Sequence, residues 1–159
     1  MSKALINQYY SEVDKLIRYG GSRKETSIRI AFQNLLNEYA KNKDLILVAE
    51  LDYKTDKGTT VYPDGTLKDA MRLDLGYWES KDEADDIEEE IKKKFAKGYP
   101  KSNILFEDSQ TAILIQQGQE IMQKANKDLG EIYIDEITTL KGVPPIAWEY
   151  KLGNRSATT

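Results

Sequence analysis

Glu79 and Lys81 are the residues in this sequence whose types and spacing most clearly suggest chemistry. They lie two positions apart in the segment Gly76-Tyr77-Trp78-Glu79-Ser80-Lys81-Asp82. On an extended strand, side chains two apart share a face, with Cβ atoms about 6–7 Å apart. A carboxylate can hold a divalent metal ion and a nearby amine can steer a water molecule, a pairing that suits phosphodiester hydrolysis. Glu-x-Lys is also common as an exposed ion pair on a surface strand, so other features of the sequence are needed to distinguish a catalytic pair from a surface pair.

The composition narrows the chemistry further. The chain has 159 residues, 40% apolar and 31% charged, which predicts one compact domain with a modest core. It contains no cysteine and no histidine, which excludes disulfides, thiolate or imidazole metal sites and histidine general bases. A metal ion would need oxygen ligands, which favours Mg2+, Mn2+ or Ca2+. For phosphodiester hydrolysis we expect Mg2+, with Mn2+ as its substitute. We expect no membrane span, and the N-terminal residues lack signal-peptide features, which predicts a cytoplasmic protein.

The charge distribution bears on the partner. The formal net charge is −4, whereas DNA-binding domains are usually basic, so contact with DNA is expected to be weak. Two basic clusters offset this charge locally and could contact phosphates or could simply keep helix faces solvated. The first holds Arg18, Arg23, Lys24 and Arg29, and the second holds Lys92, Lys93, Lys94, Lys97 and Lys101.

Apolar periodicity predicts the elements of the first half of the chain. Helical spacing indicates helices over about 2–18 and 22–39, separated by Gly20-Gly21-Ser22. The apolar run 45–51 predicts a central strand. Asp56-Lys57-Gly58 and Pro63-Asp64-Gly65 are typical of turns.

The second half continues the pattern. Residues 68–82 predict a hairpin that turns near 73–76, and 85–97 predicts a helix whose buried stripe holds Ile87, Ile91 and either Phe95 or Lys94. That helix should end at Gly98. A strand is expected over 103–107, followed by two short strands around Gln117-Gly118.

The predicted fold is therefore α/β (α+β), an αβββαβ core with an extra N-terminal helix and a β-hairpin after the last core strand. We divide the chain into 1–125, which holds these elements, and 126–159, a partly irregular C-terminal extension in which the periodic pattern weakens.

The element order and Glu-x-Lys on the third strand resemble the PD-(D/E)XK nuclease superfamily. A more specific resemblance, to the N-terminal nuclease domain of type ISP restriction–modification enzymes, spans roughly residues 20–122. It rests on 76–82 together with Asp85-Asp86-Ile87, Lys94-Phe95-Ala96-Lys97-Gly98-Tyr99-Pro100 and Asn103-Ile104-Leu105-Phe106-Glu107-Asp108. The resemblance implies a Mg2+-dependent DNA endonuclease without its own sequence recognition. The alternative is a non-catalytic remnant or interaction module that keeps the fold.

The C-terminal tail departs from that pattern. Residues 148–157 (WEYKLGNRSA) resemble a segment of the recognition region near the far C-terminus of the same enzymes, yet here they almost directly follow the nuclease-like part. The chain has neither a phosphate loop of the Gly-x4-Gly-Lys-Ser/Thr type nor an Asn-Pro-Pro-Tyr motif. The first motif is typical of a motor and the second of a methyltransferase, so neither activity is expected from this chain. The oligomeric state is open, and a homo-oligomer is compatible with the sequence.

The resemblance requires an acidic partner for Glu79 on the neighbouring strand. Asp69 is the first choice, because a hairpin turning near residue 74 would place it opposite Glu79 with Cβ atoms about 5 Å apart. Asp64, which forms a Pro-Asp pair but also fits a turn, is the alternative. Asp74 is third, since it would lie roughly 16 Å from Glu79 on one extended strand. Asp69 and Glu79 are thus the expected metal ligands.

Other residues are assigned roles by the same resemblance. Glu25 on the first core helix could complete the metal site, although it also fits a capping box with Ser22. Lys81 would orient the attacking water or stabilise charge on the phosphorane. Gln110 could contact the water or the DNA backbone, and Arg23 and Lys24 are candidate DNA contacts.

Overall fold

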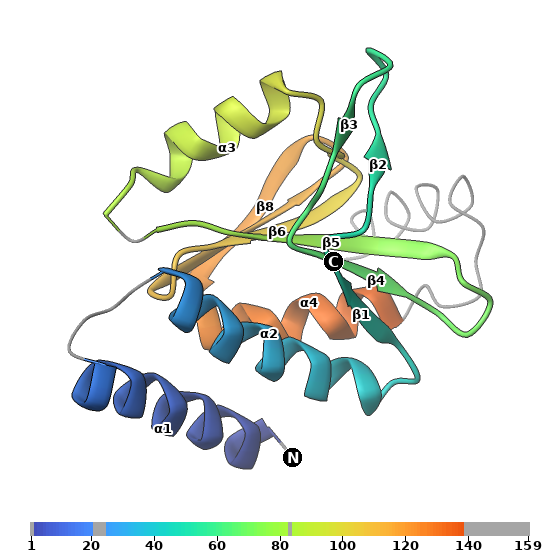
Figure 1. Cartoon of the computed structure of the whole chain (residues 1–159). Helices are drawn as coiled ribbons and strands as arrows, with labels where there is room; N and C mark the ends of the chain where they lie inside the picture. The colour runs from blue at the N-terminus through green and yellow to red at the C-terminus, as the bar shows by residue number, and fades with distance from the viewer. Residues whose placement is uncertain (1, 21–24, 83, 139–159) are drawn as a thin grey trace.

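A mixed β-sheet forms the centre of the molecule (Figure 1). The computed structural model describes residues 2–20, 25–82 and 84–138. Within this part of the chain, six strands form one sheet in the order β1-β4-β5-β6-β7-β8. They are β1 (Ile46–Ala49), β4 (Gly65–Lys68), β5 (Asp74–Ser80), β6 (Asn103–Glu107), β7 (Thr111–Gln116) and β8 (Gln119–Ala125). β5 and β6 pair in parallel, and the other neighbours pair antiparallel.

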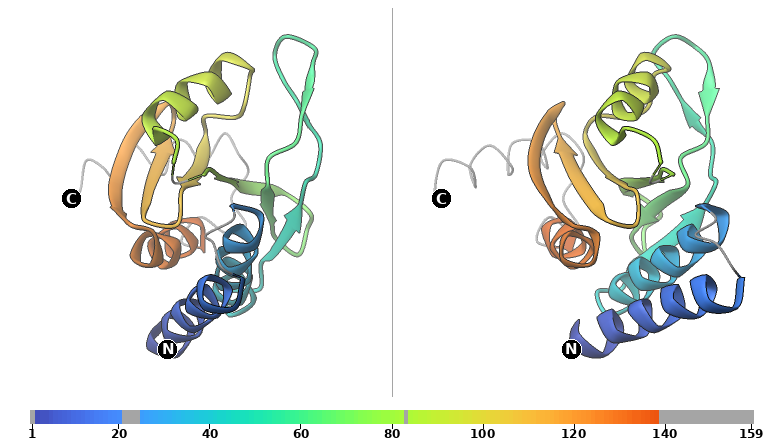
Figure 2. Two further views of the ribbon diagram at one scale, coloured as in Figure 1. Left: turned by 60° about the vertical axis from the view of Figure 1, so that its left-hand side comes forward. Right: turned by 90° about the vertical axis from the view of Figure 1, so that its left-hand side faces the viewer.

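Helices cover both faces of the sheet. On one face lie α2 (Glu25–Lys41) and α4 (Asn126–Thr138), with α1 (Ser2–Gly20) packed outside α2; the other face carries α3 (Ile87–Ala96). A separate hairpin, β2 (Tyr53–Lys54) and β3 (Thr60–Val61), rises beside α3, as the turned views in Figure 2 also show. The expected fold class is confirmed: the αβββαβ core, the extra N-terminal helix and the late hairpin β7–β8 are all present.

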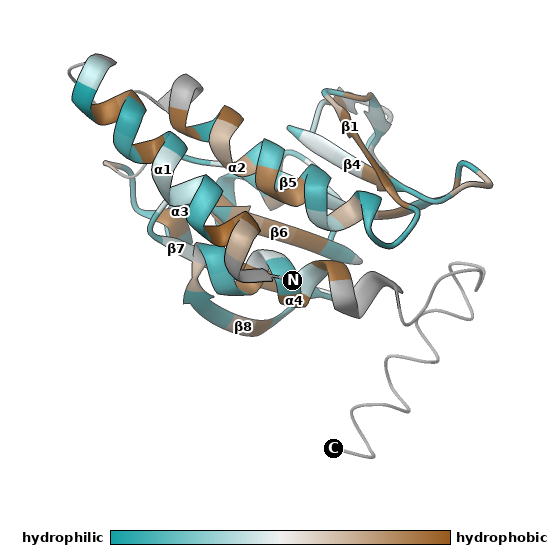
Figure 3. Ribbon diagram, turned by 90° about the horizontal axis from the view of Figure 1, so that it is seen from below, coloured by the Kyte–Doolittle hydropathy of each residue, from teal (hydrophilic) through white to brown (hydrophobic). Residues whose placement is uncertain are grey.

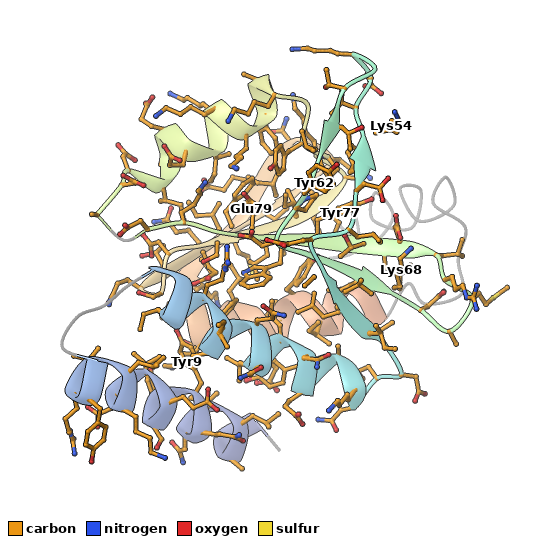
Figure 4. All side chains as sticks on the ribbon, in the orientation of Figure 1. Tyr9, Lys54, Tyr62, Lys68, Tyr77 and Glu79 are labelled. Atoms are coloured by element: carbon orange, nitrogen blue, oxygen red, sulfur yellow. The ribbon has the colours of Figure 1, made fainter. Side chains whose placement is uncertain are left out.

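The sheet separates two apolar clusters, because alternate strand residues point to opposite faces. On the side of α2 and α4, the core contains Phe32, Leu36, Trp78, Leu105 and Tyr133, all fully buried or nearly so. Seen from that side in Figure 3, β6 is hydrophobic along much of its length. α1 adds Tyr9, which packs edge-on against the Phe32 ring at 5.8 Å between centroids (Figure 4). Among the described residues, this cluster is the larger of the two.

The second cluster lies under α3 and the β2–β3 hairpin. Ile91 of α3 packs with Phe106 and Ile104 of β6, and Tyr53 of the hairpin packs edge-on against Tyr77 at 5.5 Å. Asp86 caps the N-terminus of α3 by accepting a hydrogen bond from the Glu88 amide. Gly98 ends the helix at φ +98°, as the sequence predicts, and its missing Cβ leaves room for Thr55 of the hairpin. α3 and the hairpin therefore close over the same face of the sheet.

One expectation about the sheet is wrong. The apolar run 45–51 forms β1, but β1 is an edge strand rather than a central one. Ile46 is 61% exposed, while Leu45, just before the strand, is buried under α2. A short apolar run has the same pattern whether one or both of its edges are paired, so periodicity could not separate the two cases.

The C-terminal extension begins with α4, which belongs to the same core. Leu129 and Tyr133 are fully buried, and the Tyr133 hydroxyl donates a hydrogen bond of 2.7 Å to the Tyr77 carbonyl oxygen of β5. The tail resembling a recognition segment, residues 148–157, lies outside the described residues. Among the helices of the described part, none is both long and apolar enough to cross a membrane.

Candidate active site

Two carboxylates meet where β4 begins and β5 ends. β4 and β5 pair so that Gly65 lies opposite Trp78, which places Asp64, one residue before β4, beside Glu79. The Asp64 amide donates a hydrogen bond of 3.0 Å to Glu79 Oε1, and the Ser80 amide donates one of 2.7 Å to Asp64 Oδ2. Figure 4 shows Glu79 near the middle of the molecule, where the sheet meets the layer of α3 and the β2–β3 hairpin. Backbone pairing thus holds both side chains in place.

Asp69, the first choice from the sequence, does not lie opposite Glu79. It follows β4 and shapes the turn into β5, where its Oδ1 accepts hydrogen bonds from the Met71 and Leu73 amides at 2.9 and 3.0 Å. Arg72 in this turn has φ +66°. The chain therefore reverses around residues 70–72 rather than near 74. The pairing of β4 with β5 consequently differs from the predicted pairing by five residues. The structure replaces Asp69 with Asp64, the alternative, and Asp74 instead forms an ion pair with Lys68.

Lys81 lies on the same side as Glu79, as strand alternation predicts. Its Nζ is 3.9 Å from Glu79 Oε2 and 3.3 Å from Glu90 Oε1 on α3. Its amide donates to the Glu107 carbonyl oxygen at 2.8 Å, which extends the β5–β6 pairing past the end of β5. Trp78 points to the opposite face and packs in the core, as expected. The ammonium of Lys81 is therefore fixed between a carboxylate of the sheet and one of the helix.

Two further cations belong to this group, and the sequence assigned neither to the site. Lys94 Nζ lies 2.8 Å from Glu79 Oε2, and Arg29 of α2 reaches Asp64 Oδ1 at 3.4 Å. The sequence offered a signal for Lys94, because it occupies a position in the buried stripe of α3 where an apolar residue would be usual. Glu90, one turn before Lys94 on the same helix, pairs with Lys93 and Lys81 instead. Arg29 carries no comparable local signal.

Burial governs the protonation of the two carboxyls. Desolvation raises the pKa of Asp64 above its ordinary value, and hydrogen bonding from Ser80 and the charge of Arg29 oppose it only in part. Desolvation also raises the pKa of Glu79, and the charge of Asp64 raises it further. Ionising both groups together is therefore unfavourable. Glu90, which accepts a hydrogen bond from Lys93, has a lowered pKa and stays ionised.

The two carboxylates fit a hard divalent cation. Mg2+ is typically held by one or two protein carboxylates, with water and substrate phosphate completing its shell. Asp64 and Glu79 provide two such groups side by side. Desolvation raises the pKa of both, the charge of Asp64 raises the pKa of Glu79 further, and a bound cation would favour the ionised form of each. Among the described residues, no group of three or more acidic side chains gathers to hold a metal ion. These two would therefore be the protein ligands from the described part of the chain.

The remaining sequence candidates are placed only in part. Glu25 begins α2, but its side chain, like Arg23, Lys24 and the capping residue Ser22, lies outside the described residues. Gln110 sits in the exposed turn between β6 and β7, where its amide donates to Asp108 Oδ1 at 3.0 Å. A cavity of about 120 Å3 lies elsewhere, between α1 and α2, and no residue of the acidic site lines it.

The raised pKa values predict how stability depends on pH in the absence of metal. A carboxyl whose pKa is higher in the folded state favours folding below its unfolded pKa, and that contribution is lost as pH rises through the folded value. We therefore expect Asp64→Asn to gain stability relative to the wild type as pH increases from about 4 to 8. Urea unfolding at several pH values, with a metal chelator present, measures this difference. A difference that shrinks as pH rises would contradict the prediction.

A comparison with solved structures agrees with this fold. No protein-family model matches the chain, and no curated protein sequence does either. Among solved structures, a chain in the cryo-EM structure of a DrdV–DNA complex matches with 41% sequence identity and a TM-score of 0.81. The match covers 93% of this chain but 15% of that one, so the present chain spans a small part of the larger protein's length.

Proposed function

We propose that this chain is a Mg2+-dependent DNA endonuclease domain that hydrolyses phosphodiester bonds. The observation that carries the proposal is the meeting of Asp64 and Glu79 at the β4–β5 junction, with Lys81 on the same side. The likeness to part of a DrdV–DNA complex supports both the nuclease-like fold and DNA as the partner. It also supports kinship with the nuclease domains of restriction–modification enzymes, to which the sequence motifs point.

In this proposal Asp64 and Glu79 hold the metal ion. When bound there, Mg2+ would supply a Lewis acid for the phosphate oxygens and lower the pKa of a bound water. Lys81 keeps its ammonium within reach of the same position, where its N–H groups can stabilise negative charge on the phosphorane oxygens. The Ser80 amide orients Asp64 by its hydrogen bond to Oδ2, so the acidic pair is positioned before the substrate arrives.

Binding to DNA should be weak and independent of sequence. The chain has a net charge of −4, so few phosphate contacts can be made without opposing repulsion. Affinity built on phosphate contacts falls steeply with salt. The test is incubation with supercoiled plasmid at low salt with Mg2+ or Mn2+. We expect slow, metal-dependent conversion to nicked circles at high protein concentration. No nicking in either metal would favour the alternative, a non-catalytic remnant or interaction module.

Metal binding should also stabilise the fold. A ligand that binds only the native state at tenfold excess over its dissociation constant adds about 1.4 kcal/mol to the free energy of unfolding. For a domain of this size, that raises the thermal midpoint by roughly 3–6 °C. Thermal melts with and without millimolar Mg2+ or Mn2+ measure the shift. Glu79→Gln and Asp64→Asn should abolish it, and a shift that survives both variants would place the metal elsewhere.

A further inference from the structure

We propose that Lys94 is a built-in counter-ion that takes the place of a divalent cation at Glu79, so that the Lys94–Glu79 ion pair and metal binding exclude each other. On metal binding, Lys94 leaves Glu79 and its ammonium becomes available to a DNA phosphate. This inference rests on the proposed function, because it assigns to Lys94 a positioning role at the same site.

Both oxygens of the Glu79 carboxylate already have partners in the protein. Its Oε1 accepts the Asp64 amide at 3.0 Å, and its Oε2 lies 2.8 Å from Lys94 Nζ and 3.9 Å from Lys81 Nζ. Lys94 is thus the closer of the two ammonium groups. Glu79 as a whole is only 3% exposed. A metal ion could reach Oε2 only if Lys94 moved away.

The ammonium group of Lys94 is also held by Tyr99. Lys94 Nζ donates a hydrogen bond of 3.3 Å to the Tyr99 hydroxyl and lies 4.7 Å from the centre of its ring. Tyr99 is anchored in the apolar cluster beneath α3, and the turn at Gly98 brings it back toward the helix. By contrast, the Lys92 side chain on the same helix is 74% exposed, and its ammonium pairs with the carboxylate of Glu89 at 3.5 Å. The fold therefore holds the Lys94 ammonium in a defined position, whereas the Lys92 ammonium is solvated.

Charge balance gives the exclusion its physical basis. Asp64, Glu79 and Glu90 pair with Arg29, Lys81, Lys93 and Lys94, so the carboxylates of the site already have cationic partners without a metal. A divalent cation at Glu79 would stand beside the Lys94 ammonium with water largely excluded, where like charges repel strongly. Movement of Lys94 toward solvent or toward a phosphate relieves that repulsion. The site can then accept metal and DNA together more readily than metal alone.

The first experiment compares Mn2+ binding in the wild type with that in Lys94→Gln, by electron paramagnetic resonance of free Mn2+ without DNA. Glutamine can still donate a hydrogen bond to Glu79 but carries no charge. We expect Lys94→Gln to bind Mn2+ at least about tenfold more tightly, since each 1.4 kcal/mol of relieved repulsion is a factor of ten. Lys92→Gln is the matched control and should stay within about twofold of the wild type, because solvent and salt screen its charge.

The second experiment needs no variant and therefore does not depend on whether Lys94→Gln folds. An amine-acetylating reagent labels the wild-type protein, and mass spectrometry follows the labelling rates of Lys94 and Lys92. Without metal, Lys94 should react slowly because its amine is engaged by Glu79 and Tyr99. Saturating Mn2+ should raise the Lys94 rate severalfold and leave Lys92 unchanged.

The outcomes separate this inference from the proposed function. Equal or weaker Mn2+ binding in Lys94→Gln, or Lys94 labelling that Mn2+ does not change, would overturn the counter-ion role while leaving the nuclease proposal intact. Tighter binding and faster labelling without plasmid nicking would support the counter-ion role and count against the nuclease. If neither protein binds Mn2+ at millimolar concentration, the metal site is wrong and both proposals fall.

Discussion

Replacing Glu79 with glutamine reduces metal-dependent plasmid nicking by at least about 100-fold, the loss expected when a group that stabilises transition-state charge or holds the metal is removed. Lys81→Ala should give a loss of similar size, because the ammonium that faces developing phosphorane charge is gone. The measurement is the initial rate of nicked-circle formation at low salt with Mn2+. Circular dichroism confirms that each variant is folded, which we expect because both substitutions leave the two apolar clusters intact.

Aspartate variants test which acidic partner serves Glu79. Asp64→Asn should lose activity as Glu79→Gln does, because Asp64 lies beside Glu79. Asp69→Asn should keep most of its activity, since its carboxylate binds amides of the β4–β5 turn instead. The reverse result would restore Asp69 as the partner. Nicking that survives Glu79→Gln and Lys81→Ala alike would indicate a contaminating nuclease.

Replacing Trp78 with alanine lowers the free energy of unfolding by about 3–5 kcal/mol, the usual cost of deleting a fully buried large aromatic side chain. Trp78 has no exposed surface and its ring lies 6.0 Å from that of Phe32, so it joins β5 to α2. The neighbouring residue on β5 is Glu79, so the loss also loosens the strand that carries the site. Urea denaturation at constant pH measures the change.

The matched control for this variant is Tyr62→Ala. Tyr62 follows β3 and is 57% exposed, so its truncation should change stability by no more than about 0.5 kcal/mol. A loss near 1 kcal/mol or less for Trp78→Ala would show that the helix layer holds β5 without this contact. The difference between the two variants measures what burial of an aromatic side chain contributes here.

The elements of this fold were predictable from the sequence because their signals are local. Helical spacing predicted α1, α2 and α3, and Gln117-Gly118 predicted the turn between β7 and β8, where both residues have positive φ. Strand alternation placed Glu79 and Lys81 on one face and Trp78 on the other. Each of these inferences depends on residues only a few positions apart. The fold class followed from the order of the elements.

The partner of Glu79 was not predictable in the same way, because it depends on hairpin register. Two turn positions a few residues apart are both compatible with the alternation of 65–80, yet they place different aspartates opposite Glu79. The hydrogen bonds from the Met71 and Leu73 amides to Asp69 select the earlier turn. The Asp69 carboxylate thus shapes the register that places Asp64 beside Glu79.

The sequence by itself determined the chemical groups available at this site, which are carboxylates and amines without histidine or cysteine. It also determined that Glu79 and Lys81 lie on the same face of their strand. Only the tertiary structure decided which of them meet. Arg29 comes from α2, Lys94 from α3 and Asp64 from the start of β4, and their convergence depends on how helices pack across the sheet. Packing joins residues that are up to 65 positions apart, as Arg29 and Lys94 are, and no local pattern records such distances.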